Sequence, residues 1–316
     1  SGVNSAIGSG SLIVLGSVSG AATLTYTGTA TGTTTVDRGL TLAHTGANGA
    51  TINNNGSGPL VFSGTFANSQ TAGAKTLTLG GTNTGLNEFQ SAIVNGSGGT
   101  LAVTKANAGT WILSGNNSYS GTTTVSAGLL RLNHSNAIPS TSNIVMSGGL
   151  LGLGAGDLSR TFGTGANQIS ITGANSGFAA FGADRTVNLG AALQWGATTG
   201  ADAYNQASLL LSHATATHTI TLSSGLTMAA TGTRTLNVAD GAADVDAAVS
   251  GQISGGSTTG LSKGGAGTLV LSNTANNWVG QTFVDGGTLR LGASEVLPSV
   301  TLTVKRGTGQ TATGVL

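Results

Sequence analysis

Residues 263–298 read KGGAGTLVLSNTANNWVGQTFVDGGTLRLGASEVLP, and the chain contains an earlier version of the same stretch. Residues 105–139 read KANAGTWILSGNNSYSGTTTVSAGLLRLNHSNAIP, and a single one-residue insertion aligns the two copies. Spacing, residue chemistry and order all recur. The repeated structural positions are Gly109 with Gly267, Leu113 with Leu271, Ser114 with Ser272, Gly121 with Gly280, Val125 with Val284, Gly128 with Gly287 and Arg131 with Arg290.

Each copy has the pattern of short β-strands. In Thr268–Ser272 and Thr288–Gly292, leucines occupy every second position, as expected when one face of a strand packs inward. Glycine and asparagine bound these runs and supply the positive φ that tight corners need. A unit of this kind cannot bury its own apolar stripe, so neighbouring units must cover one another. The sequence therefore predicts a β-solenoid with coils of about 20 to 25 residues.

The two copies resemble a known family. Their shared pattern is K-x-G-x-G-T-L-x-L-S, then N-x-Y/W-x-G-x-T-x-V, then G-x-L-R-L and a closing proline, and it is similar to the autotransporter-associated β-strand repeat. The first copy departs at Asn107 and Leu129, where the second has Gly265 and Thr288. The resemblance implies an all-β, right-handed parallel β-helix in the passenger region of a secreted bacterial surface protein. It brings no catalytic residues with it.

Composition agrees with one extended solenoid over residues 1–316. Glycine takes 54 of 316 positions, charged residues 7% and proline only three, which fits neither collagen nor a charge-rich disordered chain. No linker or charge block marks a domain boundary, although the chain is longer than most single globular cores. We therefore expect a single β-solenoid with full repeat copies at 105–139 and 263–298, and a segment or mature piece of a longer repeat protein.

Charge and cysteine content limit the possible partners and compartments. The formal net charge of +1 is too small for electrostatic binding to nucleic acid or to an anionic membrane surface. No apolar run approaches the ~18 residues of a membrane span, so we expect no membrane insertion of this segment. Cysteine is absent, which mildly favours export through an oxidising periplasm. Residues 1–11 lack the charged and apolar regions of a signal peptide.

The rest of the chain continues the strand pattern. Asn53–Asn55 are expected to form either an asparagine ladder between coils or a solvated turn. Residues 173–207 are rich in aromatics and form either a larger coil or a side excursion. Residues 240–254 have a helical composition, but Gly251 interrupts it, so we expect strands and turns there. We expect two short strands within 11–27 and a half-copy of the second part of the repeat at 33–42. Further strands are expected at 51–52, 60–63, 75–79, 91–94, 100–104, 143–153, 168–172, 186–189, 208–212, 218–222, 234–238 and 300–304.

Candidate metal and cofactor sites are weak in this sequence. His213 and His218 are five residues apart, which places them on opposite faces of a strand and disfavours a shared metal ion. Asp240, Asp244 and Asp246 could gather around calcium, but a solvated acidic turn is the better interpretation because the calcium-roll repeat is missing. The run GGAG at 264–267 is expected to be a corner and not a nucleotide loop. We predict no metal, no cofactor and no catalytic residue.

Two alternative functions use the same scaffold. A carbohydrate-active enzyme, either a lyase or a glycosidase, would need paired carboxylates in one groove, and the acidic residues are scattered. A carbohydrate-binding module would use Trp195 and its aromatic neighbours Phe178, Phe181 and Tyr204. The acidic residues are Asp37, Glu88, Asp157, Asp184, Asp202, Asp240, Asp244, Asp246, Asp285 and Glu295.

Further residues recur between the two copies. Lys105 matches Lys263, and the aromatic Tyr119 matches Trp278. The structural interpretation is that the aromatic ring fills a recurrent bulge while the basic residue caps an outer face; the functional interpretation is a repeated ligand stripe. We favour the structural one, because residues that recur with each coil are what stacking itself requires. Leu271, Leu289 and Leu291 are predicted to point into the core.

These observations predict a non-enzymatic, secreted surface module that serves as stalk, fibre or adhesin on the outer surface of a bacterium. Expected partners are neighbouring repeats or further copies of the chain, and host or cell-surface glycans are an alternative class of partner. Strand-like 11–15 and 300–304, and an ending at Gly314–Leu316 without a helical cap, suggest either continuation or head-to-tail self-association.

Overall fold

The computed structural model describes residues 11–16, 20–44, 47–228, 231–255 and 258–304. Among these residues there are strands, turns and short bridges but no helix. Every strand pair whose register is defined is parallel, and one isolated antiparallel bridge joins Ala180 to His218. The fold is therefore all-β and forms a parallel β-solenoid, as predicted. Contacts divide the chain into a first unit (1–145 with 165–167) and a second unit (146–164 with 168–316), which are described separately.

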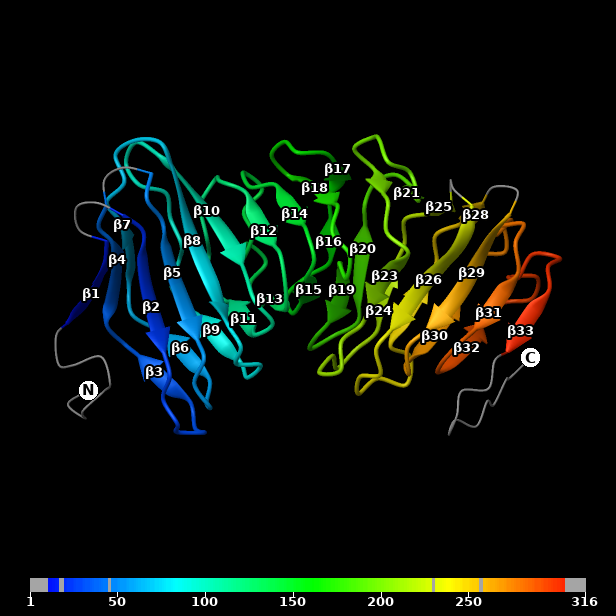
Figure 1. Cartoon of the computed structure of the whole chain (residues 1–316), viewed down its shortest axis with the longest axis horizontal. Coiled ribbons are helices and arrows are strands. Elements are labelled where there is room, and N and C mark those ends of the chain that lie inside the picture. Colours follow the sequence, from blue (N-terminus) through cyan, green and yellow to red (C-terminus); the bar gives the residue numbers. More distant parts are fainter. Residues whose placement is uncertain (1–10, 17–19, 45–46, 229–230, 256–257, 305–316) are drawn as a thin grey trace. The chain divides into compact units, whose positions relative to one another are not determined.

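The first unit winds its chain over three parallel sheets in turn, and each sheet is named here for its first strand (Figure 1). The β1 sheet contains β1 (Leu12–Leu15), β4 (Gly39–Leu42) and β7 (Phe66–Asn68). The β2 sheet contains β2 (Ala22–Tyr26), β5 (Ala50–Asn54), β8 (Ala74–Gly81), β10 (Thr100–Lys105) and β12 (Thr123–Val125). The β3 sheet contains β3 (Thr34–Val36), β6 (Leu60–Phe62), β9 (Asn87–Phe89), β11 (Thr110–Leu113) and β13 (Leu129–Leu132).

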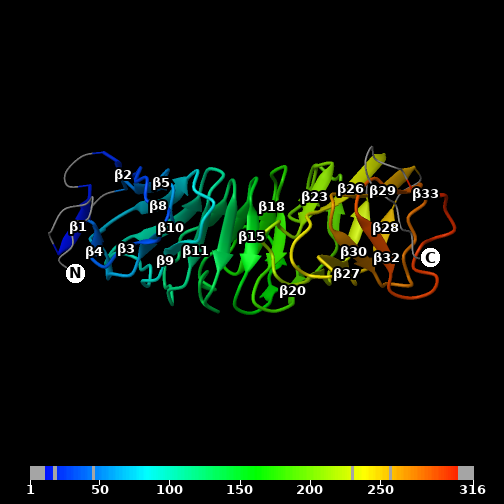
Figure 2. The same ribbon diagram turned by 90° about the horizontal axis from the view of Figure 1, so that it is seen from below.

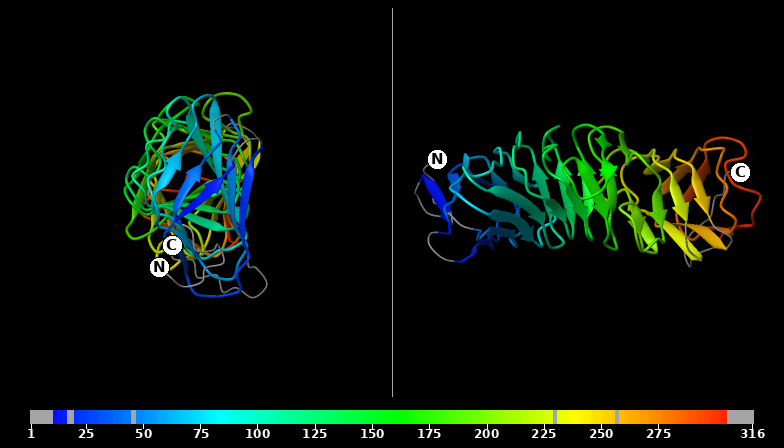
Figure 3. Two further views of the ribbon diagram at one scale, coloured as in Figure 1. Left: turned by 90° about the vertical axis from the view of Figure 1, so that its left-hand side faces the viewer. Right: turned by 90° about the horizontal axis from the view of Figure 1, so that it is seen from above.

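The second unit repeats the three-sided arrangement, and its paired strands lie side by side in Figures 2 and 3. Its β15 sheet contains β15 (Leu150–Leu153), β19 (Gly177–Ala180), β23 (Ser208–Leu211), β26 (Gly232–Val238), β29 (Thr259–Gly264), β31 (Thr282–Val284) and β33 (Leu302–Val304). Its β16 sheet contains β16 (Leu158–Ser159), β20 (Arg185–Asn188), β24 (Ile220–Leu222), β27 (Ala247–Val249), β30 (Thr268–Leu271) and β32 (Thr288–Leu291). Its β21 sheet contains β21 (Leu193–Trp195), β22 (Ala203–Tyr204), β25 (Leu226–Met228) and β28 (Ile253–Gly255).

Three short strands complete the set. β17 (Thr161–Phe162) pairs with β18 (Gln168–Ile171), and β14 (Ile144–Met146) lies where the two units divide. Residues 240–254 form a turn followed by β27 and β28, so the choice of strands over a helix is confirmed.

Strand register shows that coil length varies along the chain. In the repeats the coils are short: Val103 pairs with Thr123, 20 residues later, and Thr268 with Thr288, also 20 later. Elsewhere they are longer, as where Ser208 pairs with Thr235, 27 residues later. The predicted length of about 20 to 25 residues therefore holds only for the repeats.

The aromatic region between residues 173 and 207 contains the largest coil. Arg185 pairs with Ile220, 35 residues later, and the extra chain forms β22 beside β21. Both suggested interpretations of this region apply, because the coil is larger and the added length is a short loop that returns to place β22 parallel to β21.

The core is narrow and is filled by rows of apolar side chains that stack from coil to coil. Trp111, Leu113, Val125 and Leu271 are fully buried, and in the first unit the rings of Phe62 and Phe89 stack with centroids 5.7 Å apart. Stacking of this kind adds packing energy beyond the burial of area alone. Interior rows of one residue type are possible because parallel in-register coils place equivalent side chains one above another.

Two sequence predictions about the strands need correction. Residues 91–94 were expected to form a strand, but the segment is strandless, because the Ile93 backbone N–H donates to the side chain of Asn117 (2.8 Å) and not to a neighbouring strand. Leu271 is buried as predicted, whereas Leu289 and Leu291 are only half-buried. Their register with Leu269 and Leu271 is as expected, but within the described residues no strand pairs with the outer edge of β32.

Candidate functional site: the repeat corners

Lys105 and Lys263 lie inside the solenoid. In the first unit, Lys105 continues the inward row of β10 and is aligned between Leu79 of β8 and Val125 of β12. In the second unit, Lys263 is aligned in the same way between Leu236 and Val284. The exposed fractions are 0% for Lys105 and 2% for Lys263. An ammonium group is therefore held within an apolar row in each copy.

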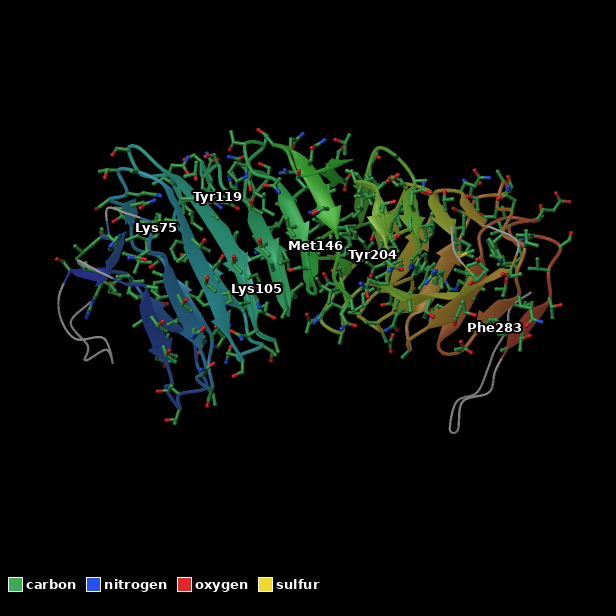
Figure 4. The ribbon with its side chains drawn as sticks, turned by 45° about the horizontal axis from the view of Figure 1, so that its top comes forward. Lys75, Lys105, Tyr119, Met146, Tyr204 and Phe283 are labelled. Carbon is green, nitrogen blue, oxygen red and sulfur yellow. The ribbon has the colours of Figure 1, made fainter. Side chains whose placement is uncertain are left out.

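Each buried ammonium is bonded to three backbone carbonyl oxygens. The Lys105 Nζ donates to the carbonyls of Ala106 (2.7 Å), Asn107 (2.7 Å) and Ala127 (3.0 Å). We call these four residues the first lysine corner. Three N–H donors match three acceptors, which satisfies the group fully without a carboxylate partner. Figure 4 labels Lys105 among the strands of the first unit.

The second lysine corner has the same connections at the aligned positions. The Lys263 Nζ donates to the carbonyls of Gly264 (2.9 Å), Gly265 (2.8 Å) and Gly286 (2.9 Å). In both copies two acceptors follow the lysine directly and the third belongs to the next coil. The agreement of two copies in different units shows that the arrangement is a property of the repeat.

Burial shifts the protonation of both lysines. Desolvation lowers the pKa of Lys105 to about 7, because an ammonium loses its hydration in the interior. Desolvation also lowers the pKa of Lys263, to about 8, and the nearby carboxylates of Asp246 and Asp240 partly oppose the shift. In the first unit, Lys75 is also buried, its pKa is lowered by burial, and its Nζ donates to the carbonyl of His44 and to Asn68 Oδ1.

The prediction that the repeated basic residue caps an outer face is wrong for the lysines. The sequence carried a signal for burial, since Lys105 lies two residues after Val103 and four after Leu101, so the period of two places the lysine inward. The arginines do lie outside: Arg290 is exposed, and Arg131 donates from Nε to Asn133 Oδ1 at 2.8 Å on the surface. Desolvation lowers the pKa of Arg131, and Glu88 opposes this shift.

Asn117 and Asn276 tie three coils together at equivalent positions. Asn117 Oδ1 accepts from the N–H of Ile93 (2.8 Å), and its Nδ2 donates to the carbonyl of Ala137 (2.7 Å). Asn276 does the same with Ile253 (2.7 Å) and Val296 (3.0 Å). Residues 114–122 and 272–281 form no strand, and we call this part the strandless side of each repeat. There the side-chain amides of Asn117 and Asn276 bond the coils together in place of paired strands.

The repeated aromatic residues fill this same side, as the structural interpretation proposed. Tyr119 and Trp278 are both fully buried. The Tyr119 hydroxyl is 2.8 Å from Thr123 Oγ1, and the Trp278 indole N–H donates to Thr282 Oγ1 at 3.1 Å. Each ring therefore packs in the core with its polar atom satisfied by a threonine four residues later.

The repeated glycines lie where coils approach closely. At Gly128 and Gly287 the φ angles are 66° and 60°, and a Cβ would lie 2.4 Å and 2.3 Å from the carbonyl oxygens of Gly109 and Gly267. A Cβ would also clash with backbone in the preceding coil at Gly109, Gly121, Gly267 and Gly280. The paired apolar positions Leu113, Val125, Leu271 and Val284 are all buried.

Of the asparagines at 53–55, Asn54 belongs to a ladder between coils, whereas Asn53 is half-buried and Asn55 is exposed. Asn54 is fully buried, and its Nδ2 donates to Asn87 Oδ1 (2.5 Å) in the next coil. Asn87 in turn donates to the carbonyl of Thr110 (2.8 Å) one coil further on, and to Asn83 Oδ1 (3.2 Å). The second of the two open interpretations is thus excluded for Asn54.

The histidines and aspartates considered for metal binding have local roles. His213 Nδ1 lies 2.8 Å from Thr215 Oγ1, and His218 Nδ1 lies 2.9 Å from Thr217 Oγ1. Burial lowers the pKa of His213. Within the part of the chain that the structure describes, no three His, Cys, Asp or Glu side chains form a group that could hold a metal ion.

Asp246 corrects the prediction of a solvated acidic turn. Asp240 and Asp244 are exposed, but Asp246 is buried and accepts backbone N–H groups from Gly241 (2.6 Å) and from Thr268 of the next coil (2.8 Å). The carboxylate acts as a corner cap between coils, because it satisfies two amides that no strand pairs.

The residues proposed for carbohydrate binding are not available for stacking on a sugar. Trp195 and Tyr204 are fully buried, with ring centroids 6.4 Å apart, and Phe178 and Phe181 are also buried. The Trp195 N–H donates to the carbonyl of Gln206 (2.7 Å), and burial raises the pKa of Tyr204. The aromatic cluster is a core of the large coil, so the interpretation as a carbohydrate-binding module loses its named residues.

The outer face of the β2 sheet carries a straight row of threonines. Its strands are in register at Thr23, Thr51, Thr78, Thr104 and Thr124, one from each of β2, β5, β8, β10 and β12. These side chains alternate with the buried positions of the same strands and are at least partly exposed. Adjacent strands are ~4.8 Å apart, so the hydroxyls repeat at that spacing along the sheet.

Comparison with known sequences identifies the repeats. Residues 103–132 and 261–291 match the profile of the passenger-associated transport repeat, so the chain carries two such repeats and the predicted resemblance is confirmed. The chain is also 40% identical over 134 residues to the adhesin BmaC autotransporter of Brucella suis biovar 1 (strain 1330). That match covers 41% of this chain and 4% of the relative, so the chain spans only a small part of the relative's length.

No solved structure is significantly similar to this chain. Among the described residues, no helix has the length and apolar character needed to cross a membrane.

Proposed function

We propose that this chain is a segment of a secreted bacterial surface protein and acts there as a non-enzymatic, adhesin-like module. It would be displayed at the outer cell surface or in the extracellular space. The observation that carries this proposal is the pair of passenger-associated transport repeats, supported by the 40% identity to a protein named as an autotransporter adhesin. The parallel β-solenoid is compatible with display, because stacked coils present long, regular outer faces.

The contact surface would be an outer sheet face and not a pocket. The threonine row on the β2 sheet is the most regular of these faces, with five aligned hydroxyls over five strands. Such a face offers hydrogen-bond donors and acceptors at even spacing and little charge. It would suit a partner that is itself repetitive, such as a surface glycan.

Adhesion of displayed protein tests the proposal. The chain would replace the passenger segment of a surface-display system in a non-adherent bacterium, and attached bacteria would be counted on cultured host cells and on immobilised glycans. We expect attachment above that of bacteria displaying an unrelated solenoid segment of equal length. Equal attachment by the two strains, with equal surface display, would contradict an adhesive role.

A variant that introduces negative charges locates the contact face. Thr78→Glu and Thr104→Glu together would place two like charges in one row, and we expect attachment to fall while display is retained. The matched control changes outward threonines of the second unit, Thr186→Glu and Thr221→Glu, which are aligned on the β16 sheet. An equal loss in both variants would exclude the β2 sheet as the specific contact face.

Head-to-tail self-association stays a prediction. Light scattering of purified protein over a range of concentrations measures it directly, since association raises the mean mass with concentration.

A further inference from the structure

We propose that the two lysine corners are proton-controlled clamps: each buried ammonium ties the corner of its own coil to the next coil, and loss of one proton releases that tie. The clamp lies inside the solenoid, at Lys105 in the first unit and Lys263 in the second. It is independent of any adhesive surface.

The number of donors makes the corner sensitive to protonation. An ammonium has three N–H donors, and each corner presents three carbonyl acceptors at 2.7 to 3.0 Å. A neutral amine has two donors and a lone pair, so one carbonyl loses its donor and the lone pair faces an oxygen. A buried carbonyl without a donor is unfavourable, and the corner must rearrange.

The bond to the next coil is the one that deprotonation releases. In each corner two acceptors lie one and two residues after the lysine, so the amine can keep them by local rotation. The third acceptor is Ala127 or Gly286, 22 and 23 residues away, and it is the only one of the three that links two coils. Gly128 and Gly287 follow these residues with left-handed backbone, which lets the peptide turn its carbonyl inward.

The groups around the two lysines differ. Beside Lys105, the adjacent strands β8 and β12 carry one titratable side chain, Lys75. Its Nζ donates to the carbonyl of His44 and to Asn68 Oδ1, away from the first lysine corner. Beside Lys263, β26 carries Arg234, the following turn carries Asp240 and Asp246, and Asp285 after β31 accepts a hydrogen bond from Ser262 (2.5 Å). The carboxylates hold the proton on Lys263, so the second clamp opens at a higher pH than the first.

Nuclear magnetic resonance of the lysine side chains tests the first step. The chain has four lysines, so labelling lysine with ¹³C and ¹⁵N gives few signals, and Lys105→Met and Lys263→Met each assign one of them. We expect titration midpoints at about pH 7 for Lys105 and about pH 8 for Lys263. If either methionine variant fails to fold, Lys105→Arg and Lys263→Arg provide the assignment. Midpoints of both lysines above pH 10 would overturn the proposal.

Hydrogen exchange tests the second step, the release of the next coil. Amides of residues 126–129 would be compared at pH 6 and pH 8.5 as protection factors, which removes the intrinsic pH dependence of exchange. We expect a fall of about fivefold, as loss of one hydrogen bond of ~1 kcal/mol implies. Unchanged protection while Lys105 loses its proton would show that the lysine titrates without acting as a clamp.

Asp240→Asn provides the matched control. Asp240 is exposed and raises the pKa of Lys263 but is in the other unit from Lys105. The variant should lower the titration midpoint of Lys263 and leave that of Lys105 unchanged. An equal shift at both lysines, or none at Lys263, would contradict the assigned electrostatics.

Discussion

The polar and glycine residues that recur in the repeat mainly shape the backbone or bond to backbone groups of neighbouring coils. Gly128 and Gly287 adopt left-handed φ, and Asn107 and Gly265 do the same at 58° and 78°. Asparagine tolerates this region better than other residues with a side chain, which explains why the first copy departs from glycine without losing the corner. The chemistry of the repeat is therefore mostly that of backbone carbonyl and amide groups that find partners across a coil.

A glycine substitution tests this at the repeat corner. Gly128→Ala should lower the free energy of unfolding by ~2 kcal/mol or more, because the left-handed φ strains alanine and its Cβ would lie 2.4 Å from a carbonyl oxygen. Gly32→Ala is the matched control, since nothing lies within 4 Å of its added Cβ. Urea denaturation measures both. A similar small effect in the two variants would mean that the corner relaxes freely.

An amide substitution tests the bridge on the strandless side. Asn117→Ala leaves the Ile93 amide and the Ala137 carbonyl without partners and should cost ~2 to 4 kcal/mol, because both groups are buried. Asn116→Ala, next to it on the surface, should cost much less. Urea denaturation measures both variants, and the midpoints are compared provided that the dependence of the unfolding free energy on urea concentration is unchanged. Equal destabilisation by Asn117→Ala and Asn116→Ala would contradict the bridging role of Asn117.

At the scale of the strand, burial depends on whether a further strand covers the row. Leu271 and Leu289 belong to the same inward row of the β16 sheet, but Leu271 is fully buried and Leu289 only half-buried. Alternation along the sequence gives the face of the sheet to which a residue points. It does not give the depth of burial, which the neighbouring coil decides.

The cost of truncation should follow that depth. Leu271→Ala is expected to cost ~2 to 5 kcal/mol and Leu289→Ala clearly less, because a fully buried leucine leaves a cavity. Thermal unfolding followed by circular dichroism compares the two. If Leu289→Ala proves as costly as Leu271→Ala, further residues of the chain or a second molecule cover β32 in solution.

Across the whole molecule, the buried lysines predict how stability depends on pH. The pKa of Lys105 is about 7 in the folded chain and 10.5 when exposed, so both states hold the proton below pH 7 and the cost of burying the charge is fully present there. Between about pH 7 and pH 10.5 the unfolded state binds more protons, and the free energy of unfolding rises with pH. The rise is on the order of a few kcal/mol, even though the clamp itself has opened.

Urea unfolding of the first unit between pH 6 and pH 10, followed by the fluorescence of Trp111, measures this slope. Replacing Trp195 and Trp278 by Phe restricts the signal to the first unit. Lys105→Met should flatten the curve, because no buried proton remains at that corner. Lys263→Met should leave it unchanged in the first unit, and a flattening there would contradict the assignment of the effect to Lys105.

The sequence determined the class of fold and the family of the repeats. Two matching copies with period-two alternation left few architectures in which each unit covers the next. The same alternation carried a signal that Lys105 points inward with Leu101 and Val103, although the repeated lysine was predicted to cap an outer face. The sequence also limited charge-driven partners, since the formal net charge is +1. These conclusions depend only on local periodicity and composition, which a single chain displays directly.

Tertiary structure alone decided which polar groups are buried and what satisfies them. Asn54 bonds to Asn87, Asp246 to the amide of Thr268, and Lys263 to the carbonyl of Gly286, all across a coil boundary. The partners lie 20 or more residues apart, and coil length varies between 19 and 35 residues, so no spacing rule in the sequence predicts them. The physical reason is that a parallel solenoid aligns residues by stacking of coils, and this register is fixed only when the whole turn has closed.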